Sequence, residues 1–388
     1  MLTTYLQKEM VQWRRDLHRI PEIGNHLPQT SSYVKSILEK YGISYTNYMN
    51  GNGIVAEILG TAPGKCVMIR ADMDALQIKE ETGLPFASNN GNMHACGHDG
   101  HTAMALGAAV YLQQHNDFAG TVKIIFQPGE EYPGGALPMI EEGALTGVDA
   151  IFGMHEGWLT KEVPKGSIGL KNGAAMASMD RFLIRIHGKG GHGASPEHTN
   201  DPILIGSEIV MALQRLSSRE VRAVDPIIVS VCRFSGGFNQ NIIPSEVELE
   251  GTVRALNQNI REYLAKRIEE IASGIANVYG AKIEYTYDYK YPAVINNEQM
   301  YKLCKETGLA LFGESMIYDM KDPLMGAEDF AEYAKMIPAN YMFMSNPGEV
   351  DGENYPHHHC KFDIDEAYFT HGSTLFAQCA LNYLKEYK

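Results

Sequence analysis

The stretch His94-Ala95-Cys96-Gly97-His98-Asp99-Gly100-His101 is followed directly by an alanine-rich segment with a helical pattern. It places imidazole, thiol and carboxylate groups at a helix N-terminus, an unusual local concentration of potential metal ligands. A simpler interpretation is that these are polar loop residues, with Asp99 as the N-cap of the helix. Potential ligands elsewhere in the chain decide between the metal-site and the capping interpretations of this loop.

Short apolar runs on either side of the loop predict a largely parallel sheet. Strands are expected at residues 54–59, 66–70, 121–126 and 150–154. Helical patterns near 101–115 and 135–143 alternate with these strands. Strands and helices in alternation are typical of an α/β domain.

Residues that can bind a metal ion follow three of these expected strands. Asp72 and Asp74 follow the second strand, Glu130 and Glu131 the third, and His155 the fourth. In open α/β sheets, ligands bind beyond the carboxyl ends of the strands. We therefore expect these side chains to converge on one edge of the sheet, which the histidine-rich loop can also reach.

The size and charge of the chain exclude some classes of function. It has 388 residues, enough for one or two domains, and its hydrophobic content of 44% is ordinary for a globular protein. The net charge of -14 is opposite to the basic surface that nucleic-acid binding requires. No nucleic-acid partner is expected.

Membrane and export signals are not expected either. The first ten residues carry charges and lack the apolar run of a signal peptide, and no stretch approaches the ~18 apolar residues of a membrane span. The 6 cysteines lack the spacing of a disulfide framework. These features predict a cytoplasmic protein with reduced thiols.

Two helices are expected before the first strand. The first begins near residue 4 and ends before Pro21, and the second covers Thr30–Lys40. Arg14, Arg15 and His18 crowd the first helix, as does Arg19. Their expected role is a solvated or salt-bridged helix face.

Residues 180–291 have the pattern of a different unit. Their predicted order is strand, helix, strand, strand, helix, strand, which is the ferredoxin-like arrangement. Residues 292–388 contain too little apolar chain for a separate core, so we expect them to complete the domain begun by residues 1–179. The predicted fold is α/β, with a mainly parallel-sheet domain that contains an inserted ferredoxin-like α+β domain.

Sulfur, nitrogen and oxygen donors that are distant in sequence suit one or two transition-metal ions at a catalytic site. In such a site, the adjacent residues Glu130 and Glu131 can have two complementary chemical roles. One carboxylate can bind metal while the other takes a proton from water that the metal activates, and then gives it to the leaving nitrogen. The alternative is two solvated glutamates that follow a strand.

Several motifs together resemble the amidohydrolase branch of the M20 metallopeptidases. They are Arg70-Ala-Asp-Met-Asp74-Ala-Leu, His94-Ala-Cys-Gly-His-Asp-Gly-His101, Gln127-Pro-Gly-Glu-Glu131, Gly188-Lys-Gly-Gly-His192-Gly-Ala, Gly236-Gly237 with Asn241-Ile-Ile-Pro244, Gly251-Thr-Val-Arg254 and Met325-Gly-Ala-Glu-Asp-Phe330. The resemblance runs from about residue 11 to residue 385. The branch contains aminoacylases, hippurate hydrolases and indole-acetyl-amino-acid hydrolases.

The resemblance implies two divalent metal ions per subunit, zinc or manganese, with cobalt or nickel as further possibilities. It implies Glu130 as the general base and, as metal ligands, Cys96, which bridges the ions, with His98, Glu131, His155 and His358.

The resemblance implies His358 as the C-terminal ligand, because the family places this histidine four residues before a Phe-Asp pair. The chain departs from the family here, since His357 stands where leucine is usual and Cys360 where proline is usual. His357 and His359 therefore stay open as alternatives.

Further roles follow from the same resemblance. Asp72, Asp74 and His101 are expected to support the ligands by hydrogen bonds, although His101 could equally be a buried structural histidine. His192 is expected to polarise the substrate carbonyl from the partner subunit of a homodimer formed through the inserted domain, which would also act as a lid.

Asn241 and Arg254 are expected to contact the substrate, with the Arg254 guanidinium suited to a carboxylate.

The expected activity is metal-dependent hydrolysis of the amide bond of N-acyl-amino acids, which releases a carboxylic acid and a free amino acid. Deacetylation of N-acetyl-diaminopimelate and dipeptide hydrolysis are alternatives within the same family. Outside the family, the same residues could serve a thiol hydrolase that uses Cys96, or a non-catalytic scaffold stabilised by metal.

Overall fold

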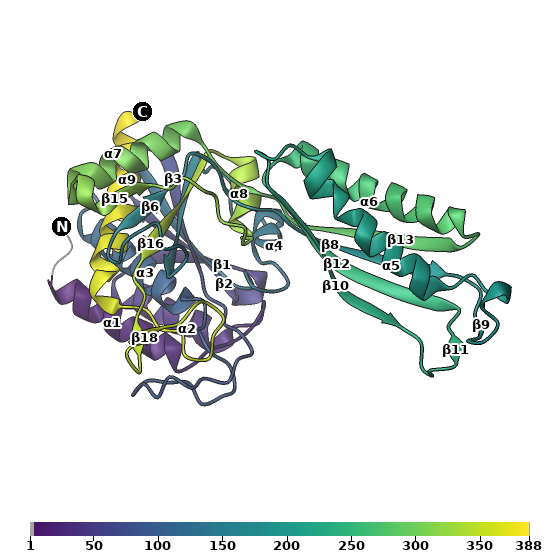
Figure 1. The fold of residues 1–388 in the computed structure, drawn as a ribbon. Coiled ribbons are helices and arrows are strands. Elements are labelled where there is room, and N and C mark those ends of the chain that lie inside the picture. Colours follow the sequence, from purple (N-terminus) through teal and green to yellow (C-terminus); the bar gives the residue numbers. More distant parts are fainter. Residues whose placement is uncertain (1–3, 388) are drawn as a thin grey trace. The chain divides into compact units, whose positions relative to one another are not determined.

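A computed structural model describes residues 4–387 and divides into two compact units (Figure 1). The smaller unit is Met176–Val294 with Met325–Glu328. The larger unit contains the described chain up to Ala175, Ile295–Leu324 and the chain from Asp329 onward. Across residues 4–387, no helix combines the length and hydropathy needed to cross a bilayer.

The helices of the larger unit are α1 (Thr4–His18), α2 (Pro28–Lys40), α3 (His98–Gln114), α4 (Ala136–Glu141), α7 (Glu298–Phe312), α8 (Phe330–Met336) and α9 (Phe369–Glu386). The strands of its main sheet are β1 (Ser44–Tyr48), β2 (Gly53–Leu59), β3 (Ala62–Asp72), β4 (Ala119–Gln127), β5 (Ala150–Gly157), β6 (Ile168–Leu170), β15 (Ile317–Asp319) and β16 (Ala339–Ser345). Two short pairs stand apart from this sheet, β7 (Gly173–Met176) with β14 (Val294–Asn296) and β17 (Glu349–Val350) with β18 (Glu353–Asn354).

The main sheet has the order β1-β2-β4-β3-β5-β16-β6-β15. Its centre is parallel, because β4 pairs with β3, β3 with β5, and β5 with β16 in parallel. Antiparallel pairing is found between β1 and β2, between β2 and β4, and between β16 and β6. The predicted mainly parallel α/β domain is confirmed.

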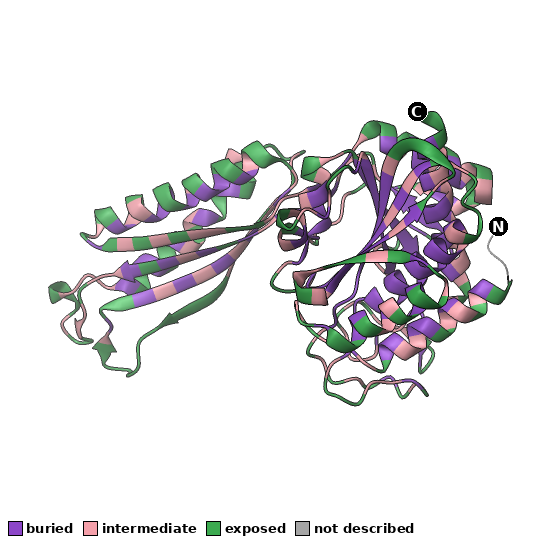
Figure 2. Cartoon of the chain, turned by 180° about the vertical axis from the view of Figure 1, so that it is seen from behind, coloured by how far each residue is buried: buried purple, intermediate pink, exposed green. Residues whose placement is uncertain are grey.

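Burial explains the central elements of this unit. Every residue of β5 is buried, as expected for a strand in the middle of a parallel sheet. Figure 2 shows buried residues, in purple, concentrated in the interior of the larger unit. Helix α3 is buried at every residue from His98 to Val110 and contacts both α1 and α9. Its alanines and glycines allow this close packing, and its first turn contacts the carboxyl end of β3, where the Thr102 hydroxyl donates to the Asp72 carbonyl oxygen.

The interpretation of Asp99 as the N-cap of the helix is wrong. Asp99 is not the N-cap, because α3 begins at His98 and Gly97 takes the N-cap position. The Asp99 carboxylate instead accepts hydrogen bonds from Arg14 Nε at 2.8 Å and from His18 Nδ1 at 2.7 Å. Of the two roles expected for these charged residues, Arg14 and His18 have the salt-bridged one, and both side chains are buried and not solvated.

The smaller unit contains β8 (Met179–His187), β9 (Gly191–His192), α5 (Pro202–Leu213), β10 (Ile227–Gly236), β11 (Ile242–Ile243), β12 (Glu246–Ala255), α6 (Gln258–Val278) and β13 (Lys282–Tyr291). Its four-stranded sheet has the order β10-β12-β8-β13 with antiparallel pairing, which is the predicted ferredoxin-like arrangement.

Apolar and charged residues alternate along β8, which gives the sheet one buried face and one exposed face. Phe182, Ile184 and Ile186 are buried in the core of the unit. Arg181 and Arg185 alternate with them and pair with glutamates of β12 on the exposed face.

Candidate metal centre

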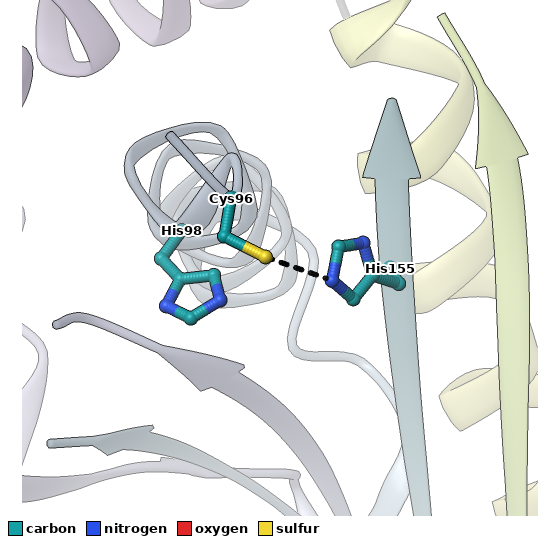
Figure 3. Close-up of side chains that lie close together, drawn as sticks. All are labelled: Cys96, His98 and His155. Carbon is teal, nitrogen blue, oxygen red and sulfur yellow. Dashed lines mark hydrogen bonds between the residues drawn. The ribbon is translucent and has the colours of Figure 1, made fainter. Parts of the chain in front are cut away.

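The predicted ligands gather at the carboxyl ends of β3, β4 and β5. Cys96, His98 and His155 offer ligand atoms that lie within 4.8 Å of one another (Figure 3). Three further groups that consist only of predicted site residues meet the same limit: Cys96, Glu131 and His358; His98, Glu130 and Glu131; Asp72, His98 and His101. The structure thus brings the five predicted ligands, the predicted base and two of the three supporting residues into one cluster.

His155 has its tautomer set by a backbone group. Its Nδ1 lies 2.9 Å from the carbonyl oxygen of Glu156. A carbonyl oxygen only accepts, so Nδ1 carries the proton and Nε2 keeps its lone pair. Nε2 faces the Cys96 sulfur at 3.5 Å (Figure 3). This orientation is the one a metal-binding histidine needs.

Asp74 holds the two glutamates through their backbone. One Asp74 oxygen accepts from the N–H of Glu130 at 2.9 Å, and the other accepts from the N–H of Glu131 at 3.0 Å. Gly129, directly before them, has a φ of 70°. The Asp74 carboxylate therefore fixes the turn after β4 from which the side chains of Glu130 and Glu131 project.

Asp72 supports the cluster from the end of β3. Its oxygens accept from Arg70 Nη1 and from His101 Nδ1, both at 2.6 Å. His101 Nε2 accepts the N–H of Glu156 at 3.0 Å. Both ring nitrogens of His101 are therefore occupied by protein groups, which leaves neither free to bind a metal ion.

His358 is the histidine of the C-terminal run that faces the cluster. The backbone N–H of His358 donates to the carbonyl oxygen of Ala95 at 2.8 Å, and its ring nitrogen Nε2 lies 3.1 Å from Glu131 Oε1. His357 instead directs its Nε2 at the Glu156 carbonyl. His359 stacks on Tyr355, with ring centroids 4.6 Å apart.

The electrostatics of the cluster fit a bound cation. Burial disfavours the charged imidazolium, yet Asp72 and Asp74 raise the pKa of His98 to about 10. The His98 nitrogens lie 3.4 Å and 3.7 Å from oxygens of these aspartates, longer than good hydrogen bonds. Burial and the nearby Glu131 and Glu130 raise the pKa of the Cys96 thiol well above its usual value.

Buried anionic donors around a thiol need positive charge before the thiolate can form. A divalent ion among these sulfur, nitrogen and oxygen donors supplies that charge. The donor set therefore fits the metal ions that the sequence predicts.

The residues expected to contact substrate lie in the smaller unit, and the structure brings only two of them together. His192 is exposed on β9, which pairs with β11, and the N–H of Gly193 donates to the Asn241 carbonyl oxygen at 2.8 Å. Arg254 is the ninth residue of β12, eight residues beyond Glu246, which is at the end of the strand that follows β11 in the sequence. At about 3.3 Å per residue, roughly 26 Å of strand separates Arg254 from that end.

Sequence reasoning missed four polar residues that hold the cluster. Asp329 accepts from Arg70 Nη2 at 2.7 Å, and also from Gln127 Nε2 at 2.7 Å. Glu156 binds three histidines through its backbone. Arg70, Gln127 and Asp329 stand within the quoted motifs, and Glu156 follows His155, but only the fold reveals their contacts.

Comparisons with known proteins agree with this geometry. A model described as Peptidase family M20/M25/M40 matches residues 68–382. The N-acetylcysteine deacetylase of Bacillus subtilis (strain 168) is 39% identical over 382 residues, which cover 98% of each protein. The N-acyl-L-amino acid amidohydrolase of Geobacillus stearothermophilus is 42% identical over 301 residues, which cover 77% of this chain and 80% of the relative.

A solved structure is also similar over its whole length. The YxeP protein of Bacillus subtilis, described as a dinuclear metal binding peptidase from the M20 family, matches with a TM-score of 0.86 and 35% identity. The match covers 98% of this chain and 99% of that one.

A mainly parallel sheet with Cys, His and Glu donors at its strand ends, and a ferredoxin-like insertion, defines a class of metal-dependent hydrolases. Since the family model spans most of the chain, the chain belongs to peptidase family M20/M25/M40, and it is a hydrolase of the amidohydrolase branch.

Proposed function

We propose that the chain hydrolyses the amide bond of N-acyl-amino acids to a carboxylic acid and a free amino acid. Support comes from two relatives, one named for deacetylation of N-acetylcysteine and one for hydrolysis of N-acyl-L-amino acids. Further support comes from the paired Glu130 and Glu131, which Asp74 holds beside the sulfur and nitrogen donors. The position of this glutamate pair beside the sulfur and nitrogen donors is the observation that carries the proposal.

In this proposal five residues hold two divalent ions, zinc or manganese, with cobalt or nickel as further candidates: Cys96, His98, Glu131, His155 and His358. When bound, the ions lower the pKa of water toward neutrality and polarise the amide carbonyl. The fixed tautomer of His155 and the contact of His358 with Glu131 support these assignments.

Glu130 is the proposed general base. It is 7% exposed, and its Oε1 lies 3.4 Å from the backbone nitrogen of Asp329. Its carboxylate takes the proton from the attacking water as the carbon–oxygen bond forms. It then gives that proton to the amide nitrogen, so that the carbon–nitrogen bond breaks with a neutral amine as leaving group.

His192 and Asn241 are proposed to donate hydrogen bonds to the carbonyl oxygen of the substrate, where charge develops. Arg254 is proposed to bind the substrate carboxylate with its fork of donors. The length of β12 between Arg254 and the other two residues supports their action from different subunits of a homodimer. Asp72, Asp74 and His101 keep the supporting roles described above.

Two alternatives receive less support. A thiol hydrolase needs a Cys96 thiolate, but burial and the neighbouring glutamates raise the pKa of this thiol. A scaffold that binds metal only for stability does not need a carboxylate such as Glu130 for proton transfer beside the ligands. Among substrates, N-acetyl-diaminopimelate and dipeptides stay alternatives to simpler N-acyl-amino acids. We also propose a cytoplasmic location, in which the Cys96 thiol stays reduced.

A substrate panel tests the proposal. Enzyme with a measured content of zinc, manganese, cobalt and nickel is assayed with N-acetyl, N-benzoyl and N-indoleacetyl amino acids, N-acetyl-diaminopimelate and dipeptides. We expect turnover of at least one N-acyl-amino acid, with the free amino acid detected as product. A metal-replete enzyme that cleaves only dipeptides, or nothing on the panel, would contradict the proposal.

A further inference from the structure

The backbone of Glu156 contacts three histidines at the end of β5. Its N–H donates to His101 Nε2 at 3.0 Å. Its carbonyl oxygen accepts from His155 Nδ1 at 2.9 Å and from His357 Nε2 at 2.9 Å. A carbonyl oxygen has two lone pairs, so both histidines can be bound at once. His155 and His357 are therefore tied to the same atom.

The side chain of Glu156 anchors this peptide group. Its Oε2 accepts from Asn346 Nδ2 at 2.6 Å, and Asn346 Oδ1 accepts the N–H of Gly157 at 2.7 Å. Both residues are buried, and Met344 and Ser345 of β16 pair with this end of β5. The carbonyl oxygen that the two histidines share is thus fixed in position by the sheet and by Asn346.

The chain makes room for the ring of His357. Gly157 has a φ of 110°, and a Cβ there would lie 2.5 Å from His357 Nε2. The His357 ring contacts the His155 ring edge-on, with centroids 5.0 Å apart, and lies 4.7 Å from the ring of Phe362. A glycine at 157 is therefore needed for His357 to reach the carbonyl.

This arrangement restricts the His155 ring. Rotation of the imidazole by 180° about its Cβ–Cγ bond would take the Nδ1 proton away from the Glu156 oxygen. A smaller rotation would bring the ring against that of His357. Both changes would move Nε2 away from Cys96, which it faces at 3.5 Å. Groups that orient a metal-binding histidine contribute to metal affinity although they do not touch the ion.

We propose that His357 is a positioning residue that, through the Glu156 carbonyl and its ring contact, fixes His155 in the orientation that binds metal. The inference rests on the proposed function only in taking His155 as a ligand. It gives a role to the histidine that stands where the family resemblance expects leucine. His357 is not placed as a ligand, because none of the groups of potential ligand atoms found among the described residues includes it.

The test measures metal affinity and a spectrum, and does not depend on turnover. Cobalt(II) is loaded into the wild-type chain and into the H357L, H357Q, H359L and H155A variants. Its affinity is measured by competition with a chromophoric chelator, and its visible absorption reports the geometry of the donors. His359 is the matched control because it lies in the same loop and stacks on Tyr355.

We expect H357L to bind one cobalt ion roughly 10- to 100-fold more weakly, with altered visible bands. H357Q, which keeps an N–H donor for the Glu156 carbonyl, should restore the affinity to within a few-fold, and H359L should match the wild type. Wild-type affinity and spectrum in folded H357L would overturn the inference. If H357L does not fold, H357F, which keeps the ring packing and lacks the donor, decides by the same criterion.

H155A separates this inference from the proposed function. Loss of one ion in H155A together with an unchanged H357L contradicts only the positioning role. Unchanged binding in H155A contradicts the ligand assignment on which the proposed function depends.

Discussion

Replacing Arg14 should destabilise the larger unit far more than replacing its neighbour Arg15. The Arg14 guanidinium binds Asp99 at 2.8 Å, Asp363 at 2.8 Å and Glu366 at 3.2 Å. Its side chain is 1% exposed and that of Asp99 is 0% exposed. Arg14 joins the segment after His98 to the segment after His358, so it also keeps two ligand-bearing parts of the chain together.

The magnitude follows from burial. Arg14→Met keeps most of the side-chain volume but leaves Asp99 with only His18 and leaves Asp363 without its guanidinium. Removal of one partner from a buried ion pair costs about 3–5 kcal/mol. Arg15 also pairs with Glu366, but its side chain is 43% exposed. Arg15→Met should therefore cost about 0–1 kcal/mol.

Urea unfolding followed by tryptophan fluorescence measures the difference. The chain has 2 tryptophans, Trp13 and Trp158, and both lie in the larger unit, so the signal reports that unit. The midpoint should fall strongly in Arg14→Met and little in Arg15→Met, with the same dependence on urea. Equal shifts in the two variants, or a loss below about 1 kcal/mol for Arg14→Met, would refute the reasoning.

Three further predictions concern acid stability, metal and assembly. Although burial raises the pKa of Glu80, hydrogen bonds and the charge of His18 lower it from 4.5 to about 2, so its stabilisation is complete above pH 4.5 and is lost as the pH falls toward 2. The urea midpoint of Glu80→Gln should therefore change less with pH than that of the wild type over this range. An equal dependence of the two midpoints on pH would count against the pairing of Glu80 with His18. Removal of metal with a chelator should abolish hydrolysis and lower the melting temperature, and divalent ions should restore both; activity that survives metal depletion would contradict the metal role. Verified mixed dimers of His192→Ala and Glu130→Gln subunits should regain part of the activity that each variant lacks, whereas no recovery would argue against action between subunits.

The sequence predicted the long elements of the fold because their apolar patterns are local. Strands β2, β3, β4 and β5 and helix α3 all lie where they were expected. Strand β1 was missed because its sequence, Ser-Tyr-Thr-Asn-Tyr, is polar and lies at a sheet edge with little burial. Strands β6 and β15 have 3 residues each, which is too short for a periodic signal.

The ligands could be predicted because three strands end in donor residues and the motifs name them. Their supports could not, because they depend on contacts between distant parts of the chain. Asn346 and Glu156 are 190 residues apart, and Arg70 and Asp329 are 259 apart. The charge-rich helix predicts a solvated or salt-bridged role for Arg14, and only the fold shows that it is buried among three carboxylates.

The adjacent residues Glu130 and Glu131 provide the most direct test of the proposed centre, since one is assigned to proton transfer and the other to metal binding. Metal content and turnover of an N-acyl-amino acid are measured on the same samples of Glu130→Gln and Glu131→Gln. Glu130→Gln should keep two ions per subunit and lose about 10²- to 10⁴-fold in kcat, whereas Glu131→Gln should lose bound metal. Full activity in Glu130→Gln, or two tightly held ions in Glu131→Gln, would contradict the account.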